Sequence, residues 1–229
     1  MRLVMFGAPG CGKGTQAERL SQKLGIPQIS VGEIFRGLKR GKQIPGMTLS
    51  KETIDEITSL INAGSLVPDE ITINVLKNRI SLPDCKNGFI LDGFPRTINQ
   101  GKALDKMLFE EGTKTDGILE IDVDDEVIVR RLSGRRTCPD CGRTYHIIDK
   151  MPTVEDKKAC PNHCENLIQR DDDKEDVIRK RLCTYHEVTA KLKPYYEAQG
   201  KLIIAKGHEK LSDTIIEVDL AMAKFKDVK

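Results

Sequence analysis

Near its beginning the chain places glycines, a lysine and a hydroxyl at spacings that suit a polyphosphate. Residues 3–6 are apolar, and the run Gly7-x-x-x-x-Gly12-Lys13 follows, with a hydroxyl at Thr15. Glycines let a backbone wrap around phosphate groups with its amide hydrogens pointing inward, and the positive end of a following helix adds to the attraction. A lysine at this position reaches the outer phosphates. The stretch therefore predicts a strand, a phosphate-binding loop and a helix.

A carboxylate and an arginine beside a second apolar run form the next chemical group. Residues 89–91 are wholly apolar, as in a buried parallel strand, and Asp92 follows them directly. Because ligands of open parallel sheets bind at the carboxyl ends of the strands, Asp92 is predicted to hold Mg²⁺, directly or through water, together with Thr15. Gly14 stands where the general motif has Ser or Thr, so the hydroxyl comes one residue late. Arg96 presents a planar fork to phosphate oxygens.

Further arginines gather in the second half of the chain. Phosphoryl transfer needs such cations, because the migrating group carries spread negative charge and catalysis is mostly positioning and electrostatic stabilisation. Arg170 and Arg181 are eleven residues apart and would share one face if a single helix reached both. A solvated basic face is the competing interpretation for some members. The set consists of Arg130, Arg131, Arg135, Arg136, Arg170, Arg179 and Arg181.

Four of the seven cysteines fall between residues 138 and 164. Cys138-x-x-Cys141 followed by Cys160 predicts a structural tetrahedral zinc site, since thiolates suit Zn²⁺ better than the hard Mg²⁺ ion. Such clustering differs from the even spread of a secreted disulfide scaffold. Either His163 or Cys164 would be the fourth ligand. The metal would stabilise a lobe that is too small to bury much apolar surface.

Composition limits the class of protein. The chain has 229 residues, of which 38% are hydrophobic and 31% charged, with a formal net charge of +2. This balance argues against a dedicated nucleic-acid or membrane-surface binder. The sequence has no apolar run near the roughly 20 residues that span a bilayer. We expect a cytoplasmic enzyme without nucleic-acid or membrane partners.

Hydrophobic periodicity predicts strands that alternate with helices. Expected strands are 3–6, 26–31, 89–91, 117–123 and 201–205; expected helices are 16–24, 33–40, 50–62, 69–80, 97–110, 125–132, 171–196 and 213–224, with a loop at 41–46. Asp69 is expected to cap its helix. The alternation predicts an α/β fold with a parallel sheet between two helical layers. The core would comprise 1–29, 68–133 and 174–229, with inserts at 30–67 and 134–173.

Several motifs together resemble the adenylate kinases with a long lid. They are GAPGCGKGTQA at 7–17, Gly32-Glu33-x-x-Arg36, the segment 63–70, LDGFPRT at 91–97, Gly134-Arg135-Arg136, Gly142-Arg143-x-Tyr145-His146 and QRDDD at 169–173. The resemblance covers essentially the whole chain. It implies a monomer with a P-loop fold, a helical nucleoside-monophosphate-binding insert and a zinc-containing lid. It also implies reversible phosphoryl transfer from Mg·ATP to AMP, giving two ADP.

The resemblance also implies roles for individual residues. It assigns to the ATP phosphates Gly10, Cys11, Gly12, Lys13, Gly14 and Thr15, and to the ATP base Thr144 and Tyr145. It assigns to AMP Val31, Arg36, Ser65, Leu66, Val67, Gly93, Phe94, Pro95, Arg96 and Gln100. Arg131, Arg135, Arg170 and Arg181 would converge on the transferring phosphate and the two nucleotides, and with Lys13 and Arg96 they form the expected catalytic set. The spacing Cys160-x-x-His163 matches the family and slightly favours His163.

Two departures from the family pattern leave alternatives open. Val31 replaces the usual Thr near the AMP base, and related pyrimidine-monophosphate kinases have a small residue there. Thr97 and Gln100, an amide able to pair with an adenine edge, favour AMP. Cys11 replaces a small Ser or Ala and is either oxidisable or an inert small side chain. A UMP or CMP kinase, a P-loop switch protein and a nucleic-acid-binding zinc ribbon are the competing functions.

Overall fold

A parallel sheet forms the centre of the protein. The computed structural model describes residues 1–43, 48–160, 162 and 164–225. Within these residues the main sheet has the order β2-β3-β1-β4-β7, and all its strands are parallel. The strands are β1 (Arg2–Phe6), β2 (Gln28–Ser30), β3 (Phe89–Asp92), β4 (Gly117–Asp122) and β7 (Leu202–Lys206). The predicted α/β fold is confirmed.

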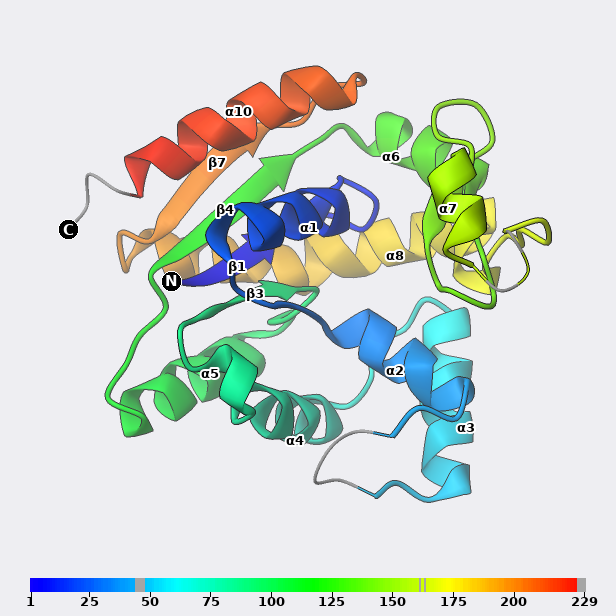
Figure 1. Ribbon diagram of the computed structural model, residues 1–229. Helices are drawn as coiled ribbons and strands as arrows, with labels where there is room; N and C mark the ends of the chain where they lie inside the picture. Colours follow the sequence, from blue (N-terminus) through cyan, green and yellow to red (C-terminus); the bar gives the residue numbers. More distant parts are fainter. Residues whose placement is uncertain (44–47, 161, 163, 226–229) are drawn as a thin grey trace.

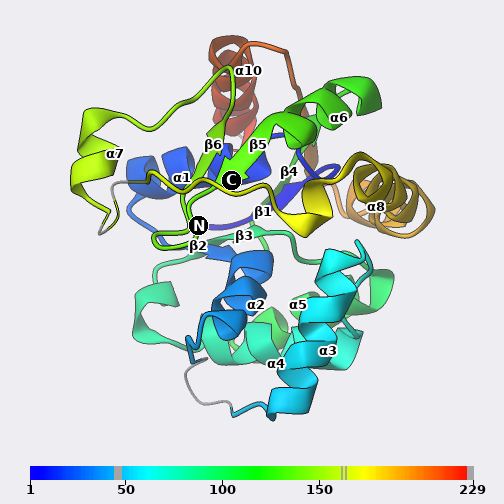
Figure 2. The same cartoon turned by 90° about the vertical axis from the view of Figure 1, so that its right-hand side faces the viewer.

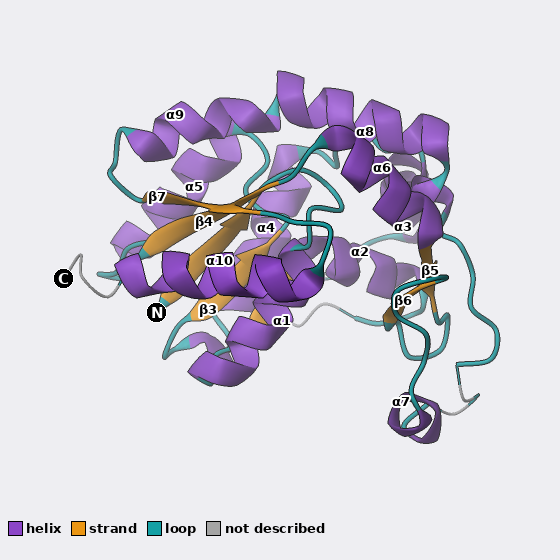
Figure 3. Ribbon diagram, turned by 90° about the horizontal axis from the view of Figure 1, so that it is seen from above, coloured by secondary structure: helices purple, strands orange, loops and turns teal. Residues whose placement is uncertain are grey.

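Helices cover both faces of this sheet (Figure 3). Val4 and Phe6 join one hydrophobic cluster, and Leu3 and Met5 join the other, because successive residues of a strand point to opposite faces. The first cluster includes side chains of α4 (Asp69–Ile80), α5 (Ile98–Glu110) and α9 (Leu192–Glu197). The second includes side chains of α1 (Lys13–Leu24), α6 (Asp125–Gly134), α8 (Glu175–Glu187) and α10 (Leu211–Lys224).

Two insertions extend from the same end of the molecule (Figures 1 and 2). The first contains α2 (Val31–Lys39) and α3 (Lys51–Asn62) and follows β2. The second contains an antiparallel pair, β5 (Arg135–Thr137) and β6 (Thr144–His146), and then α7 (Val154–Lys158). Since β5 and β6 pair only with each other among the named strands, this insert has a sheet of its own.

The start of one helix and the cap of another differ from expectation. The strand expected over 26–31 comprises only Gln28–Ser30. The helix expected from Glu33 begins two residues earlier, at Val31, because the Ser30 hydroxyl caps α2 by accepting a hydrogen bond from the Glu33 amide. The predicted cap at Asp69 is wrong, because Pro68 is the N-cap of α4 and the Asp69 carboxylate accepts hydrogen bonds from α5 and its cap residue instead.

The single helix expected over 171–196 is also wrong. The chain forms a short 3₁₀ turn, η2 (Asp171–Asp173), then α8, a second turn, η3 (Thr189–Lys191), and finally α9. Pro194 explains the second break: it lies in the first turn of α9, where its missing N–H leaves no helical hydrogen bond unmade, whereas an uninterrupted helix would lose one.

No helix in the described part of the chain combines the length and the apolar character that crossing a bilayer requires.

Candidate active site

The turn between β1 and α1 has the backbone of a phosphate loop. Gly7, Gly10 and Gly12 have φ angles of 129°, 84° and 106°, a region that favours glycine. The Lys13 ammonium lies across the turn and donates hydrogen bonds to the carbonyl oxygens of Gly7 at 2.8 Å and Ala8 at 2.7 Å. The backbone of the loop therefore holds the Lys13 ammonium in place by hydrogen bonds.

Asp92 lies beside this loop at the carboxyl end of β3. Its strand is next to β1, and Asp92 stands in register with Met5. The Gln28 amide lies 3.5 Å from Asp92 Oδ2 and 3.4 Å from the Gly14 carbonyl, which links the carboxylate to the start of α1. A Cβ on Gly14 would be 3.3 Å from Asp92 Oδ2. The absence of a side chain at Gly14 thus lets a carboxylate oxygen approach the first turn of α1, where Thr15 is exposed.

Four arginines gather where the two insertions meet the sheet. Arg181 donates a hydrogen bond to the backbone carbonyl of Asp172 at 2.7 Å and forms an ion pair with the carboxylate of the same residue at 3.1 Å. Arg36 lies 4.0 Å from that carboxylate. Arg170 donates to Glu33 at 3.1 Å and to the Thr137 hydroxyl at 2.8 Å. The fourth, Arg96, donates to the Gly93 carbonyl at 2.9 Å. The cluster is joined by carboxylates from α2 and η2.

Burial and mutual repulsion lower the pKa values of two arginines in this cluster. Burial, reinforced by the charges of Arg36 and Arg135, lowers the pKa of Arg170 to about 10. Burial, with Arg135 and Arg96 nearby, also lowers the pKa of Arg181 to about 10, although Asp172 opposes the shift. Both side chains still carry their charge at neutral pH. An anion brought among them would relieve the repulsion.

Arg135 and Arg131 lie in different surroundings. Arg135 forms a bidentate ion pair with the Asp173 carboxylate, in which Nε lies 2.7 Å from Oδ2. This carboxylate is fully buried. Arg131, one helical turn earlier on α6, donates instead to the backbone carbonyls of His208 and Glu209 in the loop after β7. The structure thus joins Arg135 to the cluster through neighbouring carboxylates and holds Arg131 apart from it.

A cleft between the first insertion and the core contains most of the residues expected to hold AMP. Its lining includes Val31, Arg36, Ser65, Leu66, Val67, Gly93, Arg96 and Gln100. Phe94 and Pro95 do not belong to this lining; both are buried behind it. Arg181 and Asp172 also line the cleft, so it opens directly onto the arginine cluster.

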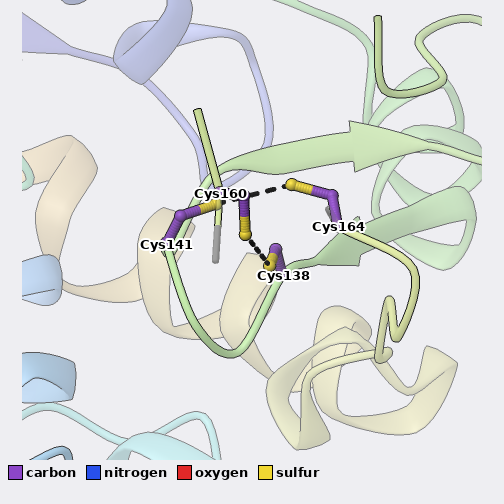
Figure 4. A group of neighbouring side chains, drawn as sticks. All are labelled: Cys138, Cys141, Cys160 and Cys164. Atoms are coloured by element: carbon purple, nitrogen blue, oxygen red, sulfur yellow. Dashed lines mark hydrogen bonds between the residues drawn. The ribbon is translucent and has the colours of Figure 1, made fainter. Parts of the chain in front are cut away.

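The four clustered cysteines converge in the second insertion (Figure 4). The sulfur atoms of Cys138, Cys141, Cys160 and Cys164 all lie within 4.8 Å of one another. The pairs 138–160 and 141–164 are 3.6 Å and 3.7 Å apart, well beyond the roughly 2.05 Å of a disulfide. Burial opposes ionisation of Cys160, but hydrogen bonds from the backbone N–H groups of Cys164 and Asn162 and from the neighbouring thiols together lower its pKa to about 7. Four thiol donors at these separations fit a tetrahedral soft metal ion.

Only one of the two candidate fourth ligands lies among the described residues, and one of the two residues expected at the ATP base is buried. His163 lies outside the described residues. Cys164 lies in the cluster, and its sulfur is 3.3 Å from the Tyr145 hydroxyl. Tyr145 is buried, with only 3% of its surface exposed, so its position favours a role in the interior of this insert over the expected contact with a base. Its neighbour Thr144 is exposed.

Sequence reasoning assigned no role to the carboxylates that organise the cluster. Glu33, Asp172 and Asp173 each bind at least one of the arginines. These three carboxylates belong to the Gly32-Glu33 and QRDDD motifs, which could have pointed to them. The carbonyl groups that hold Arg131 gave no signal, because any residue type supplies a backbone carbonyl.

The protein combines a glycine-rich phosphate loop with a carboxylate at the end of the adjoining strand. Since an arginine cluster lies on the same parallel sheet, this is a P-loop nucleotide-binding protein suited to phosphoryl transfer. The sequence profile described as "Adenylate kinase" matches residues 5–201. The chain belongs to the adenylate kinase family, as its motifs predicted.

Individual relatives are similar in sequence to this chain over almost its full length. The chain is 50% identical over 227 residues to a protein named adenylate kinase from Acetivibrio thermocellus, covering 99% of this chain and 100% of that one. Identity to the protein of the same name from Caldicellulosiruptor bescii is 49%, covering 95% of this chain and 97% of the relative. The namesake from Methanocella arvoryzae is 42% identical over 98% of this chain and all of its own length.

Proposed function

We propose that this protein catalyses the reversible transfer of the terminal phosphoryl group of Mg·ATP to AMP, giving two ADP. The observation that carries this function is the arginine cluster, three of whose members, Arg36, Arg96 and Arg181, line the cleft. An oxygen of the AMP phosphate attacks the terminal phosphorus of ATP, and the bond from that phosphorus to the bridging oxygen breaks. The family match supports the same reaction.

We assign ATP to the loop of residues 10–15. Its amides would face the phosphates, and Lys13 would exchange the carbonyl oxygens of Gly7 and Ala8 for phosphate oxygens. Asp92 and Thr15 would hold Mg²⁺ through water, since both offer the oxygen donors that this ion prefers. The ion, when bound, neutralises charge that develops on the phosphates.

We assign AMP to the cleft, with its phosphate toward Arg36 and Arg96 and its base toward Val31 and Gln100. Val31 offers an apolar surface, and Gln100 offers an amide for hydrogen bonding. The remaining assigned contacts are Ser65, Leu66, Val67 and Gly93 as lining, with Phe94 and Pro95 supporting them from behind.

Arg131, Arg135, Arg170 and Arg181 complete the proposed catalytic set with Lys13 and Arg96. Glu33, Asp172 and Asp173 would keep these side chains oriented in the absence of substrate, and phosphates would then replace part of that negative charge. Arg131 would have to leave the carbonyls of the loop after β7. Closing of the inserts at 30–67 and 134–173 over the core, 1–29, 68–133 and 174–229, would exclude water from the transfer.

We further propose that Cys138, Cys141, Cys160 and Cys164 bind a structural zinc ion. Four thiolates saturate a tetrahedral ion and leave no open position, so the metal would stabilise the lid and take no part in the reaction. Cys164 replaces His163 as the favoured fourth ligand because its sulfur already lies within the cluster. The protein would act as a monomer in the cytoplasm.

The deciding experiment measures ADP formation from Mg·ATP with AMP, UMP, CMP or GMP in parallel. A strong preference for AMP supports the proposal. A preference for UMP or CMP would mean that Val31 outweighs Gln100 and that the acceptor is a pyrimidine nucleotide. Nucleotide binding without transfer to any acceptor would indicate a switch protein.

A further inference from the structure

The Asp69 carboxylate has an unusual position for the first residue of a helix. Instead of capping α4, its Oδ1 accepts a hydrogen bond from Gln100 Nε2 at 2.7 Å and its Oδ2 accepts one from the Thr97 hydroxyl at 2.8 Å. Asp69 therefore acts as an acceptor at both of its oxygens and connects α4 to the start of α5.

The other end of the Gln100 amide is fixed as well. The backbone N–H of Arg96 donates to Gln100 Oε1 at 2.8 Å. Gln100 is 2% exposed and lines the acceptor cleft, whereas Asp69 is absent from that lining and lies behind it. If the amide turned over, its NH₂ group would face the Arg96 N–H and its oxygen would face the Asp69 carboxylate. Two repulsive contacts therefore oppose the reversed orientation.

The fixed amide leaves one donor and one acceptor for the cleft. An amide has two N–H groups and an oxygen with two lone pairs, and Asp69 and Arg96 each use one of these. The remaining N–H suits a ring-nitrogen acceptor, and the remaining lone pair suits an adjacent amino group. Adenine offers this pair at N1 and its 6-amino group. Hypoxanthine, a purine of the same size, offers the reverse order, N1–H and a 6-oxo group.

We propose that Asp69 is a positioning residue that sets the preference for a 6-amino purine by fixing the orientation of the Gln100 amide. This inference rests on the proposed function of the cleft as the AMP site. Asp69 acts without touching the base. Its carboxylate can only accept hydrogen bonds from Gln100, so it holds the amide nitrogen on one side. An asparagine at this position both donates and accepts, and it would tolerate either orientation.

The chain offers a matched control in Asp105 on α5. Like Asp69 it is half-buried, and its Oδ2 accepts hydrogen bonds from Gln199 Nε2 at 3.1 Å and the Tyr195 hydroxyl at 2.7 Å. Asp105 does not line the acceptor cleft. Asp105→Asn therefore removes the same charge from the same type of amide contact without touching the proposed orientation of Gln100.

The test compares kcat/KM for AMP and for IMP in the wild type, Asp69→Asn, Asp69→Glu and Asp105→Asn. We expect Asp69→Asn to reduce the AMP-to-IMP ratio by about fivefold to tenfold, because the reversed amide loses one of its two repulsive contacts. The change should arise from KM for the monophosphate, with KM for ATP unchanged. Asp69→Glu keeps a pure acceptor and should retain a ratio within about threefold of the wild type. Asp105→Asn should leave the ratio unchanged.

Either of two results would overturn the inference. One is an Asp69→Asn protein that transfers to AMP with the wild-type ratio; the other is an equal loss of the ratio in Asp69→Asn and Asp69→Glu. If Asp69→Asn does not fold, the glutamate variant alone decides: a ratio within about threefold of the wild type supports the inference, and a larger reduction contradicts it. A wild-type protein that transfers to neither purine monophosphate would instead overturn the proposed function itself.

Discussion

Asp173 is the carboxylate that joins Arg135 to the arginine cluster. It is fully buried, it binds Arg135 through both oxygens, and Arg181 lies 3.5 Å away. Asp173→Asn keeps the size of the side chain but removes its charge. Arg135, whose side chain is 21% exposed, would then lose the anion with which it pairs, and Arg181, 16% exposed, would keep its ion pair with Asp172. We expect a loss of both stability and turnover.

The size of the stability loss follows from this burial. Breaking a buried ion pair by removing one partner costs about 3–5 kcal/mol, and partial exposure of the arginines places the expected loss near about 3 kcal/mol. For a protein of this length the melting temperature should fall by about 6–12 °C. Because Arg135 would lose its fixed orientation, kcat should fall by about tenfold to a hundredfold.

The assay combines urea unfolding, followed by circular dichroism, with steady-state ADP formation. Asp171→Asn is the control, since that neighbouring carboxylate is 55% exposed and pairs only with the exposed Lys174 among the described residues; it should change the free energy of unfolding by less than about 0.5 kcal/mol. If the two variants unfold at the same urea concentration, the reasoning about the buried pair is refuted.

Three further changes test other parts of the structure. Cys164→Ala should reduce bound zinc to well below one ion per chain and lower the melting temperature, whereas Cys183→Ala, an exposed thiol outside the cluster, should do neither; atomic absorption and calorimetry measure both effects. Gly64→Ala should lose more stability than Gly112→Ala and raise KM for AMP, because both glycines have positive φ but only Gly64 lines the cleft and would place its Cβ 2.9 Å from atoms of α8. Equal unfolding midpoints would contradict this steric argument. Burial raises the pKa of Glu120 above its ordinary 4.5, so its contribution to stability is present below that value and is lost as the pH rises through the raised pKa. Urea titrations at several pH values should therefore show wild type losing stability relative to Glu120→Gln as the pH rises, and parallel curves would contradict the expected burial cost.

The phosphate loop and Asp92 could be predicted because their signals are local. A strand, a turn and a helix follow one another within fifteen residues, and the sheet places the end of β3 next to the loop. Gly14, which departs from the general motif, is explained only in the structure, where a side chain there would crowd Asp92. The sequence shows spacing along the chain but does not show such approaches between segments.

The arginine cluster could be predicted only in part. Arg170 and Arg181 would share one face if a single helix reached both, but α8 begins at Glu175. The Asp172 carboxylate, in the turn before α8, instead interacts electrostatically with both arginines. Periodicity predicts which residues share a helix face, and it carries no information about contacts made by a turn. Asp69 shows the same limit: its residue type is typical of a cap, and only the position of α5 determines which groups it accepts from.

The order of the strands has a consequence for how this protein is made. Leu3, at the very start of the chain, pairs with Ile90 on one side and Gly117 on the other, and Ile118 in turn pairs with Leu202. A ribosome therefore releases the phosphate loop long before the strands that flank it exist, and the edges of β1 stay unpaired through that interval. Contacts so distant along the chain slow folding and expose apolar edges to other molecules. We expect nascent chains that end before β4 to depend on chaperones, although they already contain every residue of the loop that we propose binds phosphate.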